Sequence, residues 1–305
     1  MKTVRTVAEL HEALAELSEA FTDKSGSGRN RVPSVGMIPT MGALHEGHLS
    51  LVKTARSEND IVVMSVFVNP TQFNEAVDLV AYPRAEERDA GLAEQAGVDL
   101  LFIPSAAEMY PDGYATTVSV NGPLSETLEG ARRGRGHFDG VATVVAKLLI
   151  MVLPDSAYFG QKDAQQVVVV RRMVRDLGIP TEIVTCPIVR AEDGLALSSR
   201  NERLTGEDRL RALSLSRSLF TVAAAVADGE TDTGELETVG LRVLTESDVD
   251  VEYLAFVNPE TLRPAEAVEG PVLCAVAARV GEVRLIDNVM LVSPGHDATG
   301  ATGVS

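Results

Sequence analysis

Two histidines spaced three residues apart are the clearest candidates for chemistry in this sequence. They lie in MIPTMGALHEGHLSLV (residues 37–52), where an apolar run ends near Pro39, a glycine turn follows and a helical pattern begins near Gly47. A helix N-terminus presents unpaired N–H groups and the positive end of a dipole, and both favour phosphate. His45 and His48 would donate hydrogen bonds to such an anion. A glycine turn with surface histidines would have the same letters, and HEGH lacks the HExxH spacing of zinc sites.

A lysine beside a glycine turn is a second candidate for phosphate binding. Lys162 is one of only five lysines, and it lies in YFGQKDAQQ (residues 158–166) between a short apolar run and a helical pattern. Its ammonium group would reach a phosphate at the end of the preceding strand. Asp163 would cap the helix or accept from a ribose hydroxyl, and a plain cap explains it equally well. Gln166 lies one helical turn further along.

A third segment, IVRAEDGLALSSRN (residues 188–201), combines a glycine, two serines and Arg200. Its hydroxyl and main-chain groups would offer donors to a triphosphate, and the planar guanidinium suits phosphate oxygens. Taken alone, the segment could equally be an ordinary surface turn.

Two amides and one carboxylate complete the candidates. In VFVNPTQFN (residues 66–74), Asn69 and Gln72 carry groups that both donate and accept, which suits a carboxylate or hydroxyl ligand. A strand-ending turn without a ligand would look the same. Asp89 follows AYPR within a helical pattern, where it could hold Mg²⁺ or merely solvate the helix.

Alternating strands and helices must position these residues. Apolar, β-branched runs separated by helical patterns indicate a buried parallel sheet with right-handed crossovers. We therefore expect an α/β fold, a Rossmann-like parallel sheet with helices on both faces, which binds ligands beyond the carboxyl ends of its strands. The expected strands are 35–39, 61–68, 100–104, 157–159 and 182–186, and the expected helices are 47–58, 84–96, 140–153 and 163–177.

The pattern changes after about residue 188, where a helix-rich stretch (208–228) precedes short strands such as 250–257 and 272–279. We expect a Rossmann-like domain over residues 1–187 and a smaller α+β C-terminal domain over residues 188–290. The small, polar residues of segment 23–31 are typical of a mobile loop, and those of 291–305 of a disordered tail.

Composition limits the classes of partner. The net charge is −17, from 27 basic and 44 acidic residues, which disfavours nucleic acid and anionic membranes. The longest apolar run, 141–153, contains Lys147 and is too short to span a bilayer, and the N-terminus has helical periodicity rather than a signal-peptide pattern. Cys186 and Cys274 have neither a pairing pattern nor metal-ligand spacing. We expect a soluble, cytoplasmic protein.

In this order, PTMGALHEGH, FVNPTQF, YPR, FGQKD and LSSRN resemble the pantothenate synthetase (pantoate–β-alanine ligase) family of the HIGH-type nucleotidyltransferase superfamily. The resemblance is most specific over residues 35–201 and continues more loosely to about residue 288. HEGH is similar to the family's nucleotide signature, and ALSSRN to the loop that replaces KMSKS of tRNA synthetases. The resemblance implies an ATP-dependent ligase that joins pantoate to β-alanine through a pantoyl adenylate and releases AMP and pyrophosphate.

The resemblance also implies catalytic and nucleotide-binding roles. His48 would be the proton donor, while His45, Lys162 and Arg200 would counter phosphate charge; Val189 would contact adenine. The residues implied to bind ATP are Met41, Gly42, Ala43, Leu44, His45, Glu46, Gly47, His48, Gly160, Gln161, Lys162, Asp163, Val189, Leu197, Ser198, Ser199 and Arg200.

For the other ligands, the resemblance implies that Gln72 binds pantoate and the incoming β-alanine, with Asn69 close by and Gln166 completing the pantoate pocket. Mg²⁺ would bridge the ATP phosphates near Asp89, although this chain has Arg88 where some relatives have a second acidic residue. The family also implies a homodimer with a lid formed by the C-terminal domain.

Two alternatives remain open at this point. A nucleotidyltransferase that moves AMP to a phosphorylated acceptor would share the HEGH segment but would not need FVNPTQF and FGQKDAQQ. A nucleotide-sensing or tRNA-binding module without catalysis is disfavoured by the negative charge and by the complete set of cationic and histidine side chains. Binding of ATP, pantoate and tRNA would separate the three.

Overall fold

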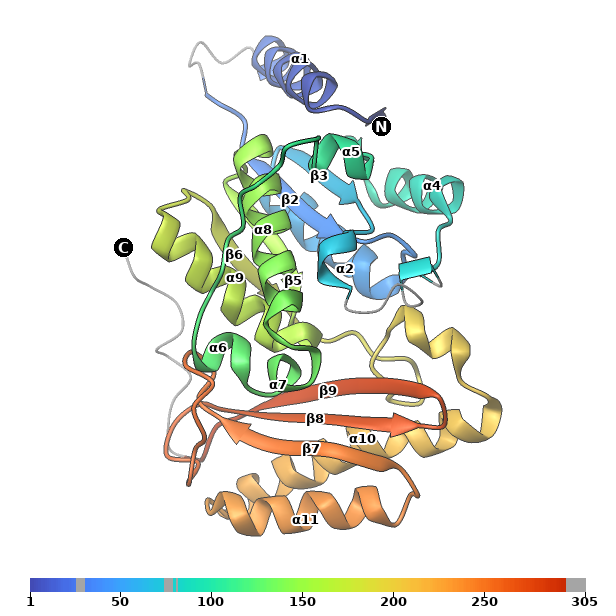
Figure 1. Ribbon diagram of the computed structural model, residues 1–305, viewed down its shortest axis with the longest axis vertical. Coiled ribbons are helices and arrows are strands. Elements are labelled where there is room, and N and C mark those ends of the chain that lie inside the picture. The colour runs from blue at the N-terminus through green and yellow to red at the C-terminus, as the bar shows by residue number, and fades with distance from the viewer. Residues whose placement is uncertain (26–30, 74–78, 81, 295–305) are drawn as a thin grey trace. The chain divides into compact units, whose positions relative to one another are not determined.

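A computed structural model of the protein shows two compact units (Figure 1). The first unit comprises residues 1–161 and 165–187, and the second comprises residues 162–164 and those from 188 onward. The change of sequence pattern at about residue 188 coincides with the start of the main part of the second unit, and the contacts add the short segment 162–164 to that unit. The structure describes residues 1–25, 31–73, 79–80 and 82–294.

The first unit is built on a six-stranded sheet in which all neighbouring strands are parallel. The strand order is β1-β4-β3-β2-β5-β6, so strands are added in opposite directions from the central pair β2 and β5. The strands are β1 (Lys2–Val4), β2 (Val35–Thr40), β3 (Ile61–Val66), β4 (Leu100–Phe102), β5 (Ser156–Gly160) and β6 (Glu182–Cys186).

Helices cover both faces of this sheet because its strands are apolar at successive positions. Side chains alternate between the two sides of a strand. Met37 thus belongs to the core cluster that includes residues of α1, α8 and α9, whereas Ile38 belongs to the cluster that includes residues of α2 and α4. The expected Rossmann-like architecture is confirmed. The helices are α1 (Val7–Ser25), α2 (Glu46–Glu58), α4 (Glu86–Ala96), α5 (Ala106–Met109), α6 (Pro123–Glu126), α7 (Glu129–Arg133), α8 (Arg135–Val152) and α9 (Ala164–Leu177).

Several boundaries differ from the expected ones for local reasons. The three-residue strand β1 is too short to give a sequence pattern. α8 begins at Arg135, before its buried face starts at Phe138, so the apolar periodicity marks only its later turns. Residues 23–25 of the expected loop end α1, and residue 291 of the expected tail ends β9. The rest of those two predictions falls largely on 26–30 and 295–305, outside the described residues.

The second unit packs two helices against an antiparallel sheet of order β7-β8-β9. Leu219 and Val222 of α10 and Leu236 of α11 share a core with the strands. This confirms the smaller α+β unit. Its elements are η3 (Ser199–Arg203), α10 (Gly206–Ala227), α11 (Thr233–Thr245), β7 (Asp250–Val257), β8 (Val272–Val280) and β9 (Val283–Leu291).

Among the described residues, α10 alone has the length and apolar composition of a membrane span, with half of its apolar window buried. Its buried side chains belong to the core of the second unit, as expected of a core helix.

The contact between α8 and the short helix η1 (Pro70–Gln72) leads to a first prediction. A Cβ on Gly140 would lie 2.6 Å from the carbonyl carbon and oxygen of Thr71, whereas a Cβ on Gly136 of the same helix would meet nothing within 4 Å. Overpacking of this kind costs typically about 1–3 kcal/mol. We expect Gly140→Ala to lower the free energy of unfolding in urea by that amount and Gly136→Ala to leave it nearly unchanged. Equal effects of the two substitutions would contradict the packing.

Candidate active site

Two of the candidate motifs of the first unit lie where the strand order reverses. β2 and β5 are neighbours at the centre of the sheet. The histidine-containing loop follows β2, while Gly160 ends β5 and Gln161 follows it. Open parallel sheets bind ligands outside the carboxyl ends of strands at such a switch point. The topology therefore explains why two of the candidate motifs follow these two strands.

His45 and His48 cap the helix α2 reciprocally. His45 is the N-cap, and its Nδ1 accepts from the N–H of Gly47 at 3.1 Å. The Nδ1 of His48 accepts from the N–H of His45 at 3.3 Å, and the two ring centroids are 4.1 Å apart. A neutral imidazole that accepts at Nδ1 carries its proton at Nε2. The cap thus fixes the tautomer in which Nε2 of each ring is a donor.

The loop before α2 has an unusual backbone that requires particular residues. Gly42 has φ +83° and Ala43 has φ +51°, so two successive residues are left-handed. A Cβ on Gly42 would also lie 2.9 Å from Oδ2 of Asp89. Glycine relieves the strain and the crowding at position 42, while Ala43 carries a strain that neighbouring contacts must offset.

The carboxylate of Asp89 supplies those contacts. Its Oδ2 accepts from the N–H of Ala43 and its Oδ1 from the N–H of Leu44, each at 2.8 Å. Asp89 lies in the first turn of α4, where the helix dipole favours negative charge, and is only 1% exposed. One buried carboxylate therefore holds the main chain of the strained loop.

This geometry does not support the expectation that Asp89 holds Mg²⁺. Both of its oxygens are engaged by backbone N–H groups, and Arg88 beside it is exposed. In the part of the chain that the structure describes, no three His, Cys, Asp or Glu side chains gather as a metal site. The donors present therefore do not fit a resident metal ion at Asp89.

Asn69 and Gln72 form one network with the histidine loop. Asn69 donates from Nδ2 to Oε1 of Gln72 at 3.0 Å, and Gln72 donates from Nε2 to Sδ of Met41 at 3.0 Å. Because the oxygen of Gln72 accepts from Asn69, the nitrogen of this amide is the atom suited to donate to a ligand. Asn69 is 1% exposed, and its amide also bonds Thr71 and the carbonyl of Gly140, so it positions Gln72.

Two residues that the sequence analysis did not single out support this network. The hydroxyl of Tyr110 donates to Oδ1 of Asn69 at 2.7 Å, and burial raises the pKa of Tyr110, which keeps the phenol protonated. Nδ1 of His137 lies 2.8 Å from the carbonyl oxygen of Gln72. Neither residue stands in a motif, so only the fold reveals them.

The two adjacent glutamines of α9 have different environments. Gln165 is buried; it accepts from the N–H of Glu129 and donates to the carbonyls of Leu124 and Thr127, all at 2.9 Å. It therefore fastens the α6–α7 segment. Gln166, the residue expected to bind a ligand, is only half-buried on the same helix.

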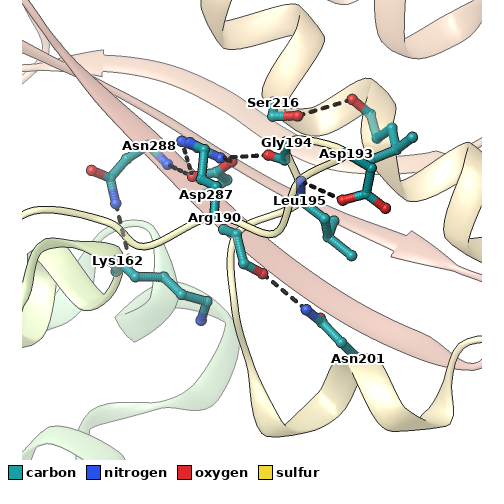
Figure 2. A network of polar contacts seen from close by, with 11 residues as sticks. Lys162, Arg190, Asp193, Gly194, Leu195, Asn201, Ser216, Asp287 and Asn288 are labelled. Atoms are coloured by element: carbon teal, nitrogen blue, oxygen red, sulfur yellow. Dashed lines mark hydrogen bonds and ion pairs between the residues drawn. The ribbon is translucent and has the colours of Figure 1, made fainter. Parts of the chain in front are cut away.

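The second unit carries the remaining candidates. The N–H of Leu197 donates to the carbonyl of Val189 at 2.9 Å, closing a hairpin. Ser198 follows as the N-cap of η3 and accepts from the N–H of Arg200 at 3.3 Å. Lys162 lies in the same unit, next to β9, as Figure 2 shows. Ser199 lies within η3, and Asp163 is exposed beside Lys162.

The expected residues thus divide between the two units. Contacts within the first unit connect Asn69, Gln72 and Asp89 to the loop that leads into α2. The loop and the start of α2 include Met41, Gly42, Ala43, Leu44, His45, Glu46, Gly47 and His48. Gly160 and Gln161 lie at the end of the neighbouring strand β5, and Gln166 lies in α9 of the same unit. The second unit holds Lys162, Asp163, Val189, Leu197, Ser198, Ser199 and Arg200.

The role of Asp89 leads to a second prediction. Asp89→Asn would set an amide N–H against a backbone N–H, and an unsatisfied buried group costs about 1–3 kcal/mol. Glu87→Gln is the matched control, since it removes the same charge from the same helical turn at an exposed position. We expect Asp89→Asn to lower the free energy of unfolding by at least about 1 kcal/mol more than the control, equally with and without Mg²⁺. A difference that appears only with Mg²⁺ would favour a metal ligand.

Comparison of the sequence with known proteins shows which family the chain belongs to. Residues 2–290 match the family model described as Pantoate-beta-alanine ligase. A pantothenate synthetase from Acidobacterium capsulatum is 53% identical over 292 residues, which cover 95% of this chain and 97% of that protein. One from Thermus thermophilus is 50% identical over 291 residues, covering 95% of this chain and 99% of that protein.

Solved structures agree. A crystal structure of pantothenate synthetase from Thermus thermophilus is 49% identical, with a TM-score of 0.86 over 96% of this chain and 100% of that one. A pantoate-beta-alanine ligase from Francisella tularensis, complexed with beta-gamma ATP and beta-alanine, is 34% identical, with a TM-score of 0.75 over 95% of this chain and 97% of that one. The chain belongs to the pantoate-beta-alanine ligase family.

Proposed function

We propose that this chain carries out the reaction of its family, the ATP-dependent ligation of pantoate to β-alanine, in two steps through an enzyme-bound pantoyl adenylate. The carboxylate of pantoate attacks the α-phosphate of ATP and releases pyrophosphate. The amine of β-alanine then attacks the acyl carbon, pantothenate forms and AMP leaves. The observation that carries this proposal is the hydrogen bond from Gln72 to Met41, which joins the amides of Asn69 and Gln72 to the histidine-containing loop.

The first step must overcome repulsion between two anions, so donors and cations are needed where charge develops. His45 and His48 suit this role because the reciprocal cap directs the donor function of both rings to Nε2. His48 is the proposed proton donor. Lys162 and Arg200 are proposed to counter phosphate charge, with the main chain of Ser198 and Ser199 as further donors.

The acid substrate needs recognition before it is activated. We assign the binding of pantoate to Gln72 and Gln166, and Gln72 is also proposed to bind β-alanine. Asn69 acts indirectly, because its amide hydrogen-bonds to Gln72 and positions it. A covalent enzyme intermediate is not required. Both cysteines are buried, and burial raises the pKa of Cys274 to about 12, which leaves that thiol unreactive.

Mg²⁺ is proposed to enter with the phosphates of ATP rather than on Asp89, since the oxygens of that residue hold the loop. The ion would neutralise phosphate charge. We also propose a cytoplasmic homodimer, on family resemblance, and small-molecule partners without nucleic acid or membrane, on the net charge of −17. The second unit is proposed to act as a lid over the nucleotide.

The role of His48 is tested by two substitutions. His48→Ala removes both the cap and the Nε2 donor, whereas His48→Asn keeps an acceptor near the Nδ1 position and removes only the donor. Loss of one preorganised donor typically costs about 10²–10³ in rate. We expect both variants to lose adenylate formation by that factor and only His48→Ala to lose thermal stability. Near-normal turnover in His48→Asn would show that His48 serves the helix alone.

The order of the steps is tested by isotope exchange. We expect labelled pyrophosphate to enter ATP in the presence of pantoate and Mg²⁺ without β-alanine, and AMP to appear once β-alanine is added. A ligase that uses an acyl phosphate would release ADP, and a simple nucleotidyltransferase would exchange without pantoate. Either result would overturn the adenylate mechanism.

A further inference from the structure

Two adjacent polar residues are buried in the last strand of the second unit. Asp287 and Asn288 on β9 are each 3% exposed, in a strand whose other buried residues are mostly apolar. Buried polar groups are costly unless they are paired, so their partners indicate what the pair does. Figure 2 shows both side chains and the two separate chain segments that they contact.

Asp287 holds the hairpin that leads to residues 197–200, which include Ser198, Ser199 and Arg200. Its carboxylate binds the guanidinium of Arg190 with two bonds, of 2.6 Å and 3.0 Å. The Arg190 guanidinium also lies 4.9 Å from the ring centre of Phe220. A bridge pairs Arg190 with Ala196, one residue before Leu197. The ion pair therefore fixes the hairpin from which residues 197–200 continue.

Asn288 holds the other segment. Its Nδ2 donates to the carbonyl oxygen of Lys162 at 3.0 Å, and its own N–H donates to Oδ1 of Asp287 at 2.8 Å. Residues 162–164 belong to the second unit by their contacts, although the residues on both sides of them belong to the first. The main chain of Lys162 is thus tied to β9, across 126 positions of sequence.

We propose that Asp287 and Asn288 are positioning residues that hold Lys162 and the loop 197–200 in a fixed spatial relation for binding the phosphates of ATP. The inference rests on the proposed function, since it takes Lys162 and Arg200 as phosphate ligands. Neither Asp287 nor Asn288 touches substrate in this scheme. Asn288 acts through Lys162, and Asp287 acts through Arg190.

The test is a double-mutant cycle between Asn288 and Lys162. Asn288→Leu keeps the branched shape and the number of side-chain heavy atoms and removes the donor. Asn288→Ser is the second variant: it is smaller, and its hydroxyl is too short to reach the carbonyl of Lys162. We expect either to slow pantoate-dependent ATP–pyrophosphate exchange about tenfold and to leave the KM for pantoate unchanged. In a Lys162→Ala background the same substitution should have almost no further effect, since coupled residues are not additive.

The matched control is Ser218→Ala. Ser218 is fully buried in the same unit and donates to the carbonyl of Gly240 at 2.9 Å, between α10 and α11. This control should lower the melting temperature without changing the exchange rate. A loss of exchange in the control as large as in the Asn288 variants would show that stability alone explains the effect.

The outcomes separate the inference from the function on which it rests. Exchange unaffected by Lys162→Ala would overturn the phosphate role of Lys162 itself. A Lys162→Ala loss that adds fully to the Asn288→Leu loss would leave that role intact and overturn only the positioning role. Failure of both Asn288 variants to fold would likewise overturn it, because Asn288 would then be a structural residue.

Discussion

The buried carboxylate of Asp89 is the interaction on which the loop between β2 and α2 depends. It accepts the N–H groups of Ala43 and Leu44, the second of which directly precedes the N-cap histidine. Without those two bonds, the left-handed turn at Gly42 and Ala43 would be opposed by its own strain. The carboxylate comes from a helix 45 positions away in sequence, so the loop takes its shape from the packed sheet rather than from local preference.

The sheet could be predicted from the sequence, whereas much of the site could not. Strands that are buried on both faces are apolar at nearly every position, so β2, β3 and β5 can be recognised as nearly continuous apolar runs in the sequence. The glycine turns that end β2 and precede α2 could also be recognised, because glycine and proline mark turns in a sequence. A hydrogen-bond partner leaves no such pattern. Asn69 lies in a motif that suggests ligand binding, yet its contacts show that it supports Gln72. Tyr110, which supports Asn69, belongs to no motif.

The second unit shows the same limit. Asp287 and Asn288 interrupt an apolar strand, and polar residues at such positions are normally predicted to face solvent. In the structure both side chains are buried and hydrogen-bonded. Their partners lie in segments far away in sequence. The boundary at residue 188 could be predicted from a change in the sequence pattern. The assignment of residues 162–164 to the second unit could not be predicted, because it depends on the contact between their main chain and β9.

The reciprocal cap of α2 has a consequence for how this protein can change over evolution. Catalytic groups usually cost a fold some stability, so drift that removes them tends to be neutral or favourable for folding. Here each histidine ring accepts a backbone N–H at the start of the same helix. Selection for a stable chain therefore favours an acceptor at the same two positions to which the proposed function assigns donors for the phosphates. A descendant that no longer needed the reaction would still need a hydrogen-bond acceptor at each of these two positions for its own folding, and asparagine would satisfy that need as well as histidine.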